Sequence, residues 1–295
     1  MMIVVTTPTG QIGRQVLQKL LSASVPVRVV ARDPSRLPDA TRDRVEVVQG
    51  SLHDPDVVTK AFEGADAIFW LLPPNGTAGS VQSAFVDFSR PACTAFAEQG
   101  VKRVVGVSAL GRGTPAAGRA GYVAGSLAMD DLIAGTGVSY RALANPSFMD
   151  NLARQATLIR AQGIFTSPIS GHRKAPSVAT RDIAAVTTRL LLDADWEGVD
   201  MVPVLGPEDL SFEDMAQTLS DVLERPVLFR QISGEVYKDQ FLTFGMSKAM
   251  AQGMLDMAVA KDAGLDNGVV RTRQNSTPTT FRHWAQDVMR PLVLG

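Results

Sequence analysis

The sequence predicts an α/β protein built on a Rossmann-type, doubly wound parallel sheet. Through the first half of the chain, short apolar β-branched segments alternate with segments whose apolar residues recur at helical spacing. This order is typical of a parallel sheet that is covered by helices on both faces. The first apolar segment, residues 3–5, runs into a small-residue turn that opens such a helix. The segment 66–72 is apolar at nearly every position, as expected of a strand buried on both faces.

The remaining elements follow from the same patterns. After residues 3–5, the expected strands of the sheet are 25–30, 45–49, 66–72, 101–108 and 138–143. Between them we expect helices at 55–62, 81–99 and 126–134, with a loop over the strand ends at 109–125. In the second half we expect a helix at 151–162, an irregular or short-stranded wall at 163–179, and a helix capped by Thr180. A strand at 199–205 is followed by a helix that Ser211 and Asp214 open in a pattern close to a capping box. A strand at 227–232, helices at 233–244 and 247–264, and a closing loop and helix at 277–288 complete the chain.

The turn after the first strand has the composition of a phosphate-binding loop. Gly10 and Gly13 let a backbone approach a pyrophosphate and let the helix pack on its strand. The N–H groups and the positive dipole end of a helix N-terminus also favour an anion. Thr7 replaces the first glycine of the usual fingerprint and Pro8 removes one N–H donor, so an ordinary strand–turn–helix stays an alternative. The residues expected to bind a dinucleotide here are Thr6, Thr9, Gly10, Gln11, Ile12 and Gly13.

The end of the second strand predicts which dinucleotide is preferred. A dinucleotide-binding sheet meets the adenosine ribose there, about 20 residues beyond the glycine turn. Arg32 leaves the strand at this point, and a guanidinium can pair with a 2′-phosphate, so we expect NADP(H) to be preferred over NAD(H). Asp33 could instead turn inward, and Arg32 could be a solvated surface charge. At neighbouring strand ends, Leu72, Pro73 and Asn145 are expected to complete the cofactor site.

Composition and charge exclude several classes of function. The 295-residue chain has a formal net charge of -1 and no basic run, so nucleic acid is not an expected partner. Its apolar runs are too short to cross a bilayer, and no membrane partner is expected. A single cysteine and three well-separated histidines favour a cytoplasmic protein without disulfides or a metal site. We expect a monomer or homodimer that acts on a small molecule.

Taken in order, the short motifs of the chain resemble the NmrA-like group of atypical short-chain dehydrogenases/reductases, which includes quinone-oxidoreductase-like members. The resemblance covers essentially the whole chain and rests on Thr9-Gly10-x-x-Gly13-Arg14, Ala31-Arg32-Asp33-Pro34, Val107-Ser108-Ala109, Pro146-Ser-Phe-Met-Asp-Asn151, Asp182-Ile183-Ala184, Leu210-Ser211-Phe212-Glu213-Asp214 and Thr277-Pro278-Thr279-Thr280-Phe281. It implies a dinucleotide-binding Rossmann domain at 1–150, completed by about 179–207. It also implies a smaller C-terminal α/β substrate-binding domain at 151–178 and 208–295. Members are NAD(P)H-dependent reductases or cofactor-sensing regulators without catalysis.

The usual catalytic pair of this superfamily is missing. Short-chain dehydrogenases commonly place Tyr-x-x-x-Lys on the helix after the fifth strand, where the ammonium lowers the phenol pKa. Here the residue four positions after Tyr122 is Ser126, and the family positions fall on Ser126 and Asp130. No lysine lies between Lys102 and Lys174. The standard proton relay is therefore not expected.

Two other side chains are candidate hydrogen-bond donors for catalysis. Ser108 ends the fifth strand and is expected to face the nicotinamide, and Tyr122 lies in the expected loop over the site. Each has a structural alternative, because serine commonly ends a strand and a loop tyrosine can pack as an apolar lid. Phe148, Met149 and Phe165 are expected to form an apolar substrate wall, or equally to belong to the core.

Three functions are compatible with these residues. We favour an NADP(H)-dependent oxidoreductase that reduces a small quinone, ketone or other conjugated carbonyl by direct hydride transfer, without the Tyr-x-x-x-Lys pair. A conjugated product oxyanion is already stabilised, so such an enzyme mainly positions its two ligands. The alternative is a non-catalytic NADP(H)-sensing regulatory protein. A further alternative is a non-redox cyclase or dehydratase on the same scaffold, which no residue pattern favours directly.

Overall fold

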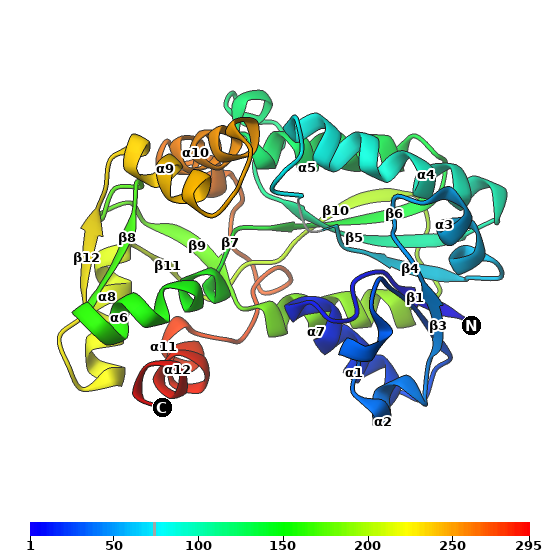
Figure 1. Ribbon diagram of the computed structural model, residues 1–295, viewed down its shortest axis with the longest axis horizontal. Coiled ribbons are helices and arrows are strands. Elements are labelled where there is room, and N and C mark those ends of the chain that lie inside the picture. The colour runs from blue at the N-terminus through cyan, green and yellow to red at the C-terminus, as the bar shows by residue number, and fades with distance from the viewer. Residues whose placement is uncertain (73–74) are drawn as a thin grey trace.

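One parallel sheet organises the molecule (Figure 1). The computed structural model describes residues 1–72 and 75–295, and its largest sheet has seven strands in the order β10-β6-β5-β4-β1-β2-β3. The strands are β1 (Ile3–Val5), β2 (Val27–Ala31), β3 (Glu46–Gln49), β4 (Ala67–Trp70), β5 (Arg103–Ala109), β6 (Ser139–Asn145) and β10 (Val199–Pro203). Every neighbouring pair is parallel. The predicted doubly wound sheet is confirmed.

Helices cover both faces of this sheet (Figure 1). One face carries α3 (Pro55–Phe62), α4 (Phe88–Glu98) and α5 (Tyr122–Ala134), and the other carries α1 (Gln11–Ser22) and α7 (Thr180–Leu192). In β1, Val4 packs in the core beneath α3 to α5, whereas Ile3 and Val5 pack in the core beneath α1 and α7. Side chains alternate between the faces of a strand. A strand covered on both faces is therefore apolar at every position.

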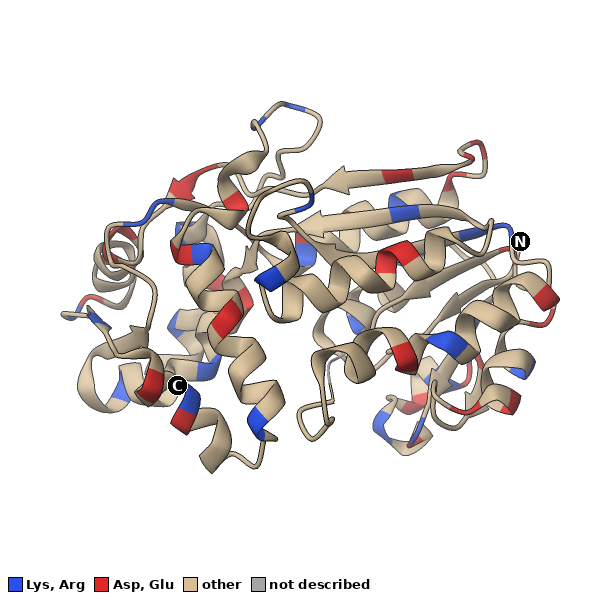
Figure 2. Ribbon diagram, turned by 90° about the horizontal axis from the view of Figure 1, so that it is seen from above, with Lys and Arg blue, Asp and Glu red and all other residues tan. Residues whose placement is uncertain are grey.

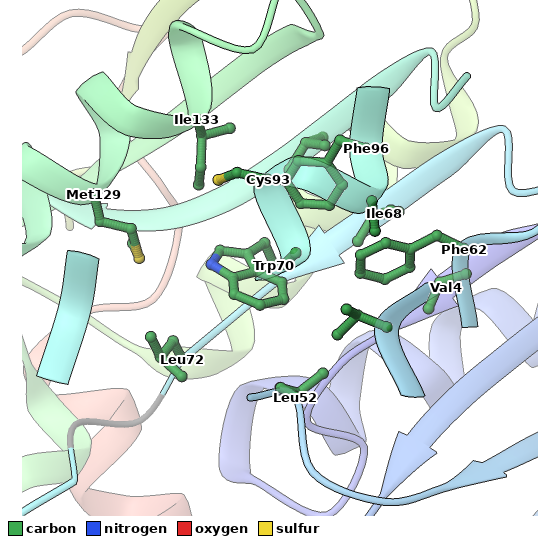
Figure 3. Packing of buried hydrophobic residues seen from close by; sticks show 14 of the residues in the cluster. Val4, Leu52, Phe62, Ile68, Trp70, Leu72, Cys93, Phe96, Met129 and Ile133 are labelled. Carbon is green, nitrogen blue, oxygen red and sulfur yellow. The ribbon is translucent and has the colours of Figure 1, made fainter. Parts of the chain in front are cut away.

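The core beneath α3 and α4 is aromatic (Figure 3). Trp70, at the end of β4, is fully buried, and the ring of Phe96 meets it edge-on with the centroids 6.0 Å apart. Phe62 of α3 stacks on Phe96 at 5.1 Å. These rings hold two helices on β4, the strand next to β1 at the centre of the sheet.

The second half of the chain adds smaller elements beside the sheet (Figure 1). A three-stranded sheet joins β11 (Asp209–Leu210), β9 (Ala175–Val178) and β7 (Ser147–Phe148), and β12 (Leu228–Gln231) pairs with β8 (Ile164–Ser167). The helices of this half are α6 (Ala156–Gln162), α8 (Phe212–Leu223), α9 (Gly234–Thr243), α10 (Lys248–Asp262), α11 (Phe281–Trp284) and α12 (Arg290–Leu294). In the first half, the short α2 (Asp39–Arg42) lies between β2 and β3 in the sequence. Ser211 and Asp214 form a full capping box at the start of α8, with bonds of 2.9 and 3.1 Å.

The predicted loop at 109–125 was wrong at its C-terminal end. A 3₁₀ turn occupies Ala117–Arg119, and α5 begins at Tyr122, four residues before the predicted start. The glycines that suggested a loop permit close packing instead. A Cβ atom at Gly121 would lie 1.9 Å from the carbonyl oxygen of Gly253 in α10, and one at Gly125 would lie 2.5 Å from a methyl group of Val81.

Two other predictions differ at helix starts. Thr180 lies inside α7, and the capping acceptor is Asp150, whose carboxylate accepts bonds from the Thr180 N–H (2.9 Å) and hydroxyl (2.8 Å). The helix predicted at 151–162 begins as a 3₁₀ helix, Met149–Gln155, before α6.

The helix predicted at 81–99 contains one wide turn. Ser83–Asp87 is π-helical and precedes α4. Pro91 lies four residues beyond Asp87 and has no N–H for the Asp87 carbonyl. Hydrophobic periodicity alone does not reveal such a turn.

The described residues include no helix that is both long and apolar enough to span a membrane. In Figure 2, Lys and Arg residues are interspersed with Asp and Glu over the visible face.

Candidate functional site

The order of the strands reverses between β1 and β4. The chain winds outward from β1 to β3 on one side and from β4 to β10 on the other, and ligands of such sheets bind at the carboxyl edge where the order reverses. Thr6 follows β1 at this point and is 2% exposed. Its hydroxyl donates to the carbonyl of Phe69 (3.0 Å) and accepts from the N–H of Leu71 (3.0 Å). The Thr6 N–H also donates to the Phe69 carbonyl, at 3.3 Å. Thr6 therefore holds the two central strands together with both its side chain and its backbone.

The N-terminus of α1 follows β1 at this edge of the sheet and has no side-chain cap. Gly10 is the N-cap residue, no side chain caps the helix, and its first turn holds no acidic residue. The Gly10 N–H bonds the Thr7 carbonyl (3.1 Å), and the first helical bond is donated by Arg14 (2.9 Å). The N–H groups of Gln11, Ile12 and Gly13 thus have no backbone acceptor within residues 1–72 and 75–295. Three such donors at the positive end of a helix suit an anion.

The two glycines of the loop have different roles. A Cβ atom at Gly13 would lie 1.8 Å from the carbonyl oxygen of Thr7, so α1 can pack this closely on β1 only with glycine here. A Cβ atom at Gly10 would meet only that oxygen, at 3.5 Å, which is ordinary contact. Gly10 therefore leaves space in front of the helix, where a phosphate group would fit. Thr9, before it, is exposed.

At the end of β2, Arg32 is exposed and Asp33 is already engaged. The Asp33 carboxylate accepts bonds from the hydroxyl (2.6 Å) and the N–H (3.1 Å) of Ser35, and these bonds lower the pKa of Asp33. The Arg32 guanidinium has no ion pair within 4.0 Å among the described residues. Asp33 has therefore turned toward its own helical turn.

Asn145 contributes a buried amide at the end of β6. Its Nδ2 donates to the carbonyls of Leu143 (2.6 Å) and Ser108 (3.1 Å). Its Oδ1 is buried and has no donor in the described part of the chain. Such a carbonyl oxygen is costly unless a ligand N–H completes it. Leu72 is 8% exposed and packs in the core, and Pro73 lies outside the described residues.

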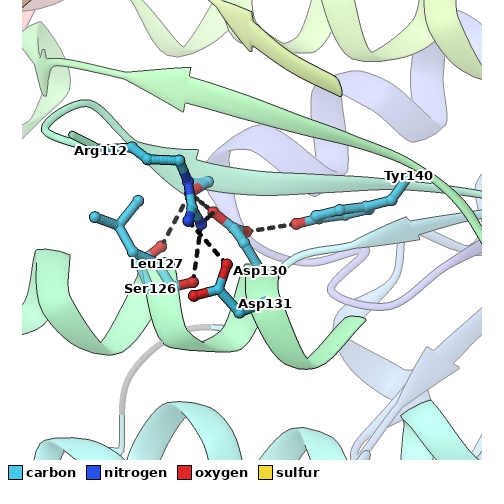
Figure 4. A network of polar contacts seen from close by, with 7 residues as sticks. Arg112, Ser126, Leu127, Asp130, Asp131 and Tyr140 are labelled. Atoms are coloured by element: carbon cyan, nitrogen blue, oxygen red, sulfur yellow. Dashed lines mark hydrogen bonds and ion pairs between the residues drawn. The ribbon is translucent and has the colours of Figure 1, made fainter. Parts of the chain in front are cut away.

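A buried polar network lies between β5, β6 and α5 (Figure 4). The Ser108 hydroxyl donates to one carboxylate oxygen of Asp130, and the Tyr140 hydroxyl donates to the other at 2.6 Å. The Ser126 hydroxyl reaches Ser108 at 3.4 Å. Burial raises the pKa of Asp130 to about 6, against the lowering effect of the two hydroxyl donors and of Arg112.

Tyr140 is the member of this network that sequence reasoning missed. It reads as a core aromatic residue in an apolar strand, and it is 1% exposed. The signal was Gly106 in the neighbouring strand, where a Cβ atom would lie 2.3 Å from the Tyr140 hydroxyl. Glycine within a strand often marks such a close approach.

Tyr122 lies on α5, not in a loop. Its ring meets Phe85 edge-on at 5.7 Å, and its hydroxyl is buried without a partner among the described residues. Burial raises the pKa of Tyr122, so the phenol stays protonated and can donate.

The predicted apolar wall is mostly core. Phe165 is fully buried against Phe212 and Phe229, and Met149 is 3% exposed in the same cluster. Phe148 is half-buried and packs against the core beneath α1 and α7.

Comparison with known proteins agrees with this geometry. A family model described as NAD(P)H-binding matches residues 8–194. An NAD(P)H azoreductase from Xenophilus azovorans is 27% identical over 285 residues, covering 97% of this chain and 96% of that protein. The (4-alkanoyl-5-oxo-2,5-dihydrofuran-3-yl)methyl phosphate reductase of Streptomyces griseus is 30% identical over 289 residues, 97% of each chain.

Solved structures share the fold. The NADPH-dependent quinone oxidoreductase of Escherichia coli, complexed with NADPH, superposes with a TM-score of 0.79 at 20% identity and 99% coverage of both chains. The family model covers more than half of this chain, and the relatives match almost its full length. The chain therefore belongs to the NAD(P)H-binding family, among the atypical short-chain dehydrogenases/reductases.

Proposed function

We propose that the chain is an NADP(H)-dependent reductase that transfers hydride directly to a small quinone, ketone or other conjugated carbonyl. The observation that carries this proposal is the uncapped N-terminus of α1 at the point where the strand order reverses. The matched relatives, an azoreductase and a furanone-type reductase by name, are both reductases. The acceptor would bind between two parts of the chain. One part is the dinucleotide-binding domain, residues 1–150 completed by 179–207, and the other is the substrate-binding domain, residues 151–178 and 208–295.

The described residues fit a nicotinamide dinucleotide. The N–H groups of Gln11, Ile12 and Gly13 would hold the pyrophosphate in the space that Gly10 leaves. The free Oδ1 of Asn145 would accept a bond from the carboxamide of the nicotinamide. When bound, the cofactor supplies the hydride.

Ser108 and Tyr122 are the proposed donors toward the acceptor. Ser108 lies at the carboxyl end of β5, and the buried Tyr122 hydroxyl has a proton without an acceptor in the described structure. Donors that are fixed before reaction stabilise charge as it develops on the acceptor oxygen. A conjugated acceptor makes modest demands on them, which fits a site without the Tyr-x-x-x-Lys pair.

We propose that Arg32 gives the preference for NADP(H). It is exposed at the end of β2, and the carboxylate that could compete with a 2′-phosphate, Asp33, is bonded to Ser35. An arginine bond to a phosphate contributes about 1.5–3 kcal/mol, or roughly ten- to a hundredfold in affinity.

The Arg32→Asp variant tests this preference. NADPH affinity should fall roughly ten- to a hundredfold, whereas NADH affinity should change little. The measurement is titration of both nucleotides by the fluorescence of the protein-bound nicotinamide. Arg189→Asp, the same charge reversal at an exposed position on α7, is the control and should leave both affinities unchanged. An equal loss for both nucleotides would remove Arg32 from the 2′-phosphate site.

The same titration, followed by a panel of quinones and aryl ketones, tests the function itself. Oxidation of bound NADPH that depends on the acceptor supports the reductase. Tight binding without oxidation by any acceptor would favour the NADP(H)-sensing protein instead.

A further inference from the structure

One buried carboxylate of the chain is held by hydroxyl groups. Asp130 is 4% exposed, and the hydrogen bonds it receives within the described residues come from Ser108 and Tyr140. The other buried aspartates have N–H or ammonium partners: Asp182 accepts from the backbone and hydroxyl of Thr279, and Asp266 pairs with Lys261.

This difference has a chemical consequence. An N–H or ammonium partner can only donate, and it therefore favours the ionised carboxylate. A hydroxyl can donate or accept, so the same geometry suits both the carboxylate and the carboxylic acid. When Asp130 is protonated, it can donate to Ser108 without any movement of heavy atoms, and the Ser108 hydroxyl is then free to donate elsewhere.

Asp130 and Ser108 lie where we expect the reaction to take place. Ser126 and Asp130 lie one turn apart on α5 and both approach Ser108, which is near the carboxyl end of β5. By the family resemblance, these are the helix positions at which short-chain dehydrogenases commonly carry the tyrosine and the lysine. The carboxyl edge of β5 also borders the site proposed for the nicotinamide.

We propose that Asp130 stores the proton that Ser108 delivers to the oxygen of the reduced substrate. Ser108 is the catalytic residue in this scheme, and Asp130 acts through it as a positioning and proton-holding residue. The inference rests on the proposed reductase function and names the proton source that the function requires.

The step balances as a two-electron reduction. The acceptor would gain a hydride, with the electron pair that a bound nicotinamide cofactor would supply, and the conjugated oxygen of the acceptor would become an oxyanion. The oxyanion forms an O–H bond with the proton of the Ser108 hydroxyl. Ser108 Oγ takes the carboxyl proton of Asp130, whose O–H bond breaks, and Asp130 is left as a carboxylate. A proton from water restores the acid.

The surroundings of Asp130 support both charge states. Arg112 approaches the carboxylate at 3.8 Å but is bonded more closely to Asp131, at 2.8 Å (Figure 4). The other titratable group near the network is Cys93 of α4, whose pKa is raised to about 12 by burial, so it stays neutral. Arg112 and Asp131 also line a cavity of about 630 Å³ beside α5.

The pH profile of turnover tests the proposal. Because the acid form of Asp130 is required and its pKa is raised to about 6, wild-type kcat should fall about tenfold per pH unit above that value. Asp130→Asn should lower kcat at pH 5.5 by roughly a hundredfold, the lower end of general-acid contributions, and should leave it independent of pH. Its KM and its NADPH affinity should stay near those of the wild type.

Two further variants keep the test decisive if Asp130→Asn folds poorly. Tyr140→Phe removes one hydrogen-bond donor to the Asp130 carboxylate, which should raise the pKa of Asp130. The fall of kcat with rising pH should therefore begin at a higher pH. Ser108→Ala should lose as much kcat as Asp130→Asn, and the double variant should lose no more than either, because the two residues act as one unit. Asp182→Asn, the same substitution at a buried carboxylate of α7, is the control. Its kcat should fall with rising pH as the wild-type kcat does.

Two results would overturn the inference alone, and a third would overturn the function with it. If Asp130→Asn kept the wild-type kcat and its pH limb while NADPH oxidation proceeded, the inference would fail and the reductase function would stand. An unmoved limb in Tyr140→Phe would have the same meaning. If no quinone or aryl ketone of the panel supported oxidation of NADPH by the wild-type protein, the function and the inference would fail together.

Discussion

Single residues set the proposed cofactor site, and the two loop glycines show how. Gly13 is needed by the fold, because an added Cβ atom would meet the Thr7 carbonyl oxygen at 1.8 Å. Gly10 has no such neighbour, since the closest atom would lie at 3.5 Å. A larger side chain at Gly13 therefore tests the packing of α1 on β1, whereas one at Gly10 tests the access of a ligand to the helix N-terminus.

Gly10→Val should abolish detectable NADPH binding and leave the fold intact, because the new side chain fills the space proposed for the phosphates. Nicotinamide fluorescence and a thermal melt are the two measurements. Gly118→Val adds the same side chain at a glycine with open space around it and should retain binding. Gly13→Ala should instead lower the free energy of unfolding by about 1–3 kcal/mol through overpacking. Undiminished NADPH affinity in Gly10→Val would refute the phosphate-loop interpretation.

The sequence predicted some site residues and not others, for physical reasons. The glycine loop and Arg32 follow from short-range rules, because strand, turn and helix are contiguous there. The orientation of Asp33 depends on Ser35, two residues away, and was left open. Tyr140 meets Asp130 only because Gly106 of the paired strand leaves room, and strand pairing is not written in local periodicity.

At the scale of elements, helix starts depend on partners that are distant in the chain. α7 begins where Asp150 accepts two bonds from Thr180, across 30 residues. The sequence offered Thr180 as the cap because only its neighbours could be considered. A sequence pattern can thus identify the helix while missing the residue that caps its start.

Asp150→Ala should destabilise the protein by about 1–2 kcal/mol, as loss of a helix cap does. The measurement is the free energy of unfolding from chemical denaturation. Asp239→Ala, at an exposed position on α9, should change it by less than about 0.5 kcal/mol. A loss no greater than that of Asp239→Ala would show that Asp150 does not cap α7.

For the whole molecule, the buried network predicts how stability responds to pH. The pKa of Asp130 is raised from 3.8 to about 6 by burial. Below pH 3.8 the group is protonated in both states, and as pH rises toward 6 the unfolded chain ionises first. The folded state is thus penalised progressively, by on the order of 2–3 kcal/mol once the pH exceeds about 6.

Asp130→Asn removes this penalty, because the amide does not ionise. The free energy of unfolding of the variant relative to the wild type should therefore rise between pH 4 and 7 and level off above. Chemical denaturation at several pH values measures this difference, in which the contributions of other titrating groups cancel. A difference that does not vary with pH would contradict the raised pKa.

The sheet was predictable at this scale, and the smaller elements were less so. Seven strands with helices between them repeat one local pattern. Among the smaller strands, β12 was predicted at 227–232, and β8 and β9 lie in the wall predicted at 163–179 as irregular or short-stranded. The two-residue strands β7 and β11 were not predicted, because a segment of two residues shows no alternation. The pairing partners of the smaller strands, such as β12 for β8, lie far along the chain.

The two hydrogen bonds between Asp182 and Thr279 bear on the order in which parts of the chain fold during synthesis. The Asp182 carboxylate lies 6% exposed in the first turn of α7, and the N–H and hydroxyl that satisfy it come from a residue 97 positions later. At roughly 5–20 residues per second of synthesis, the ribosome needs about 5–20 s to supply that partner. Until then, burying the Asp182 carboxylate of the nascent chain would cost free energy, because its hydrogen-bond donors have not been synthesised. Docking of the C-terminal segment on α7 is thus a late step in the maturation of the folded protein.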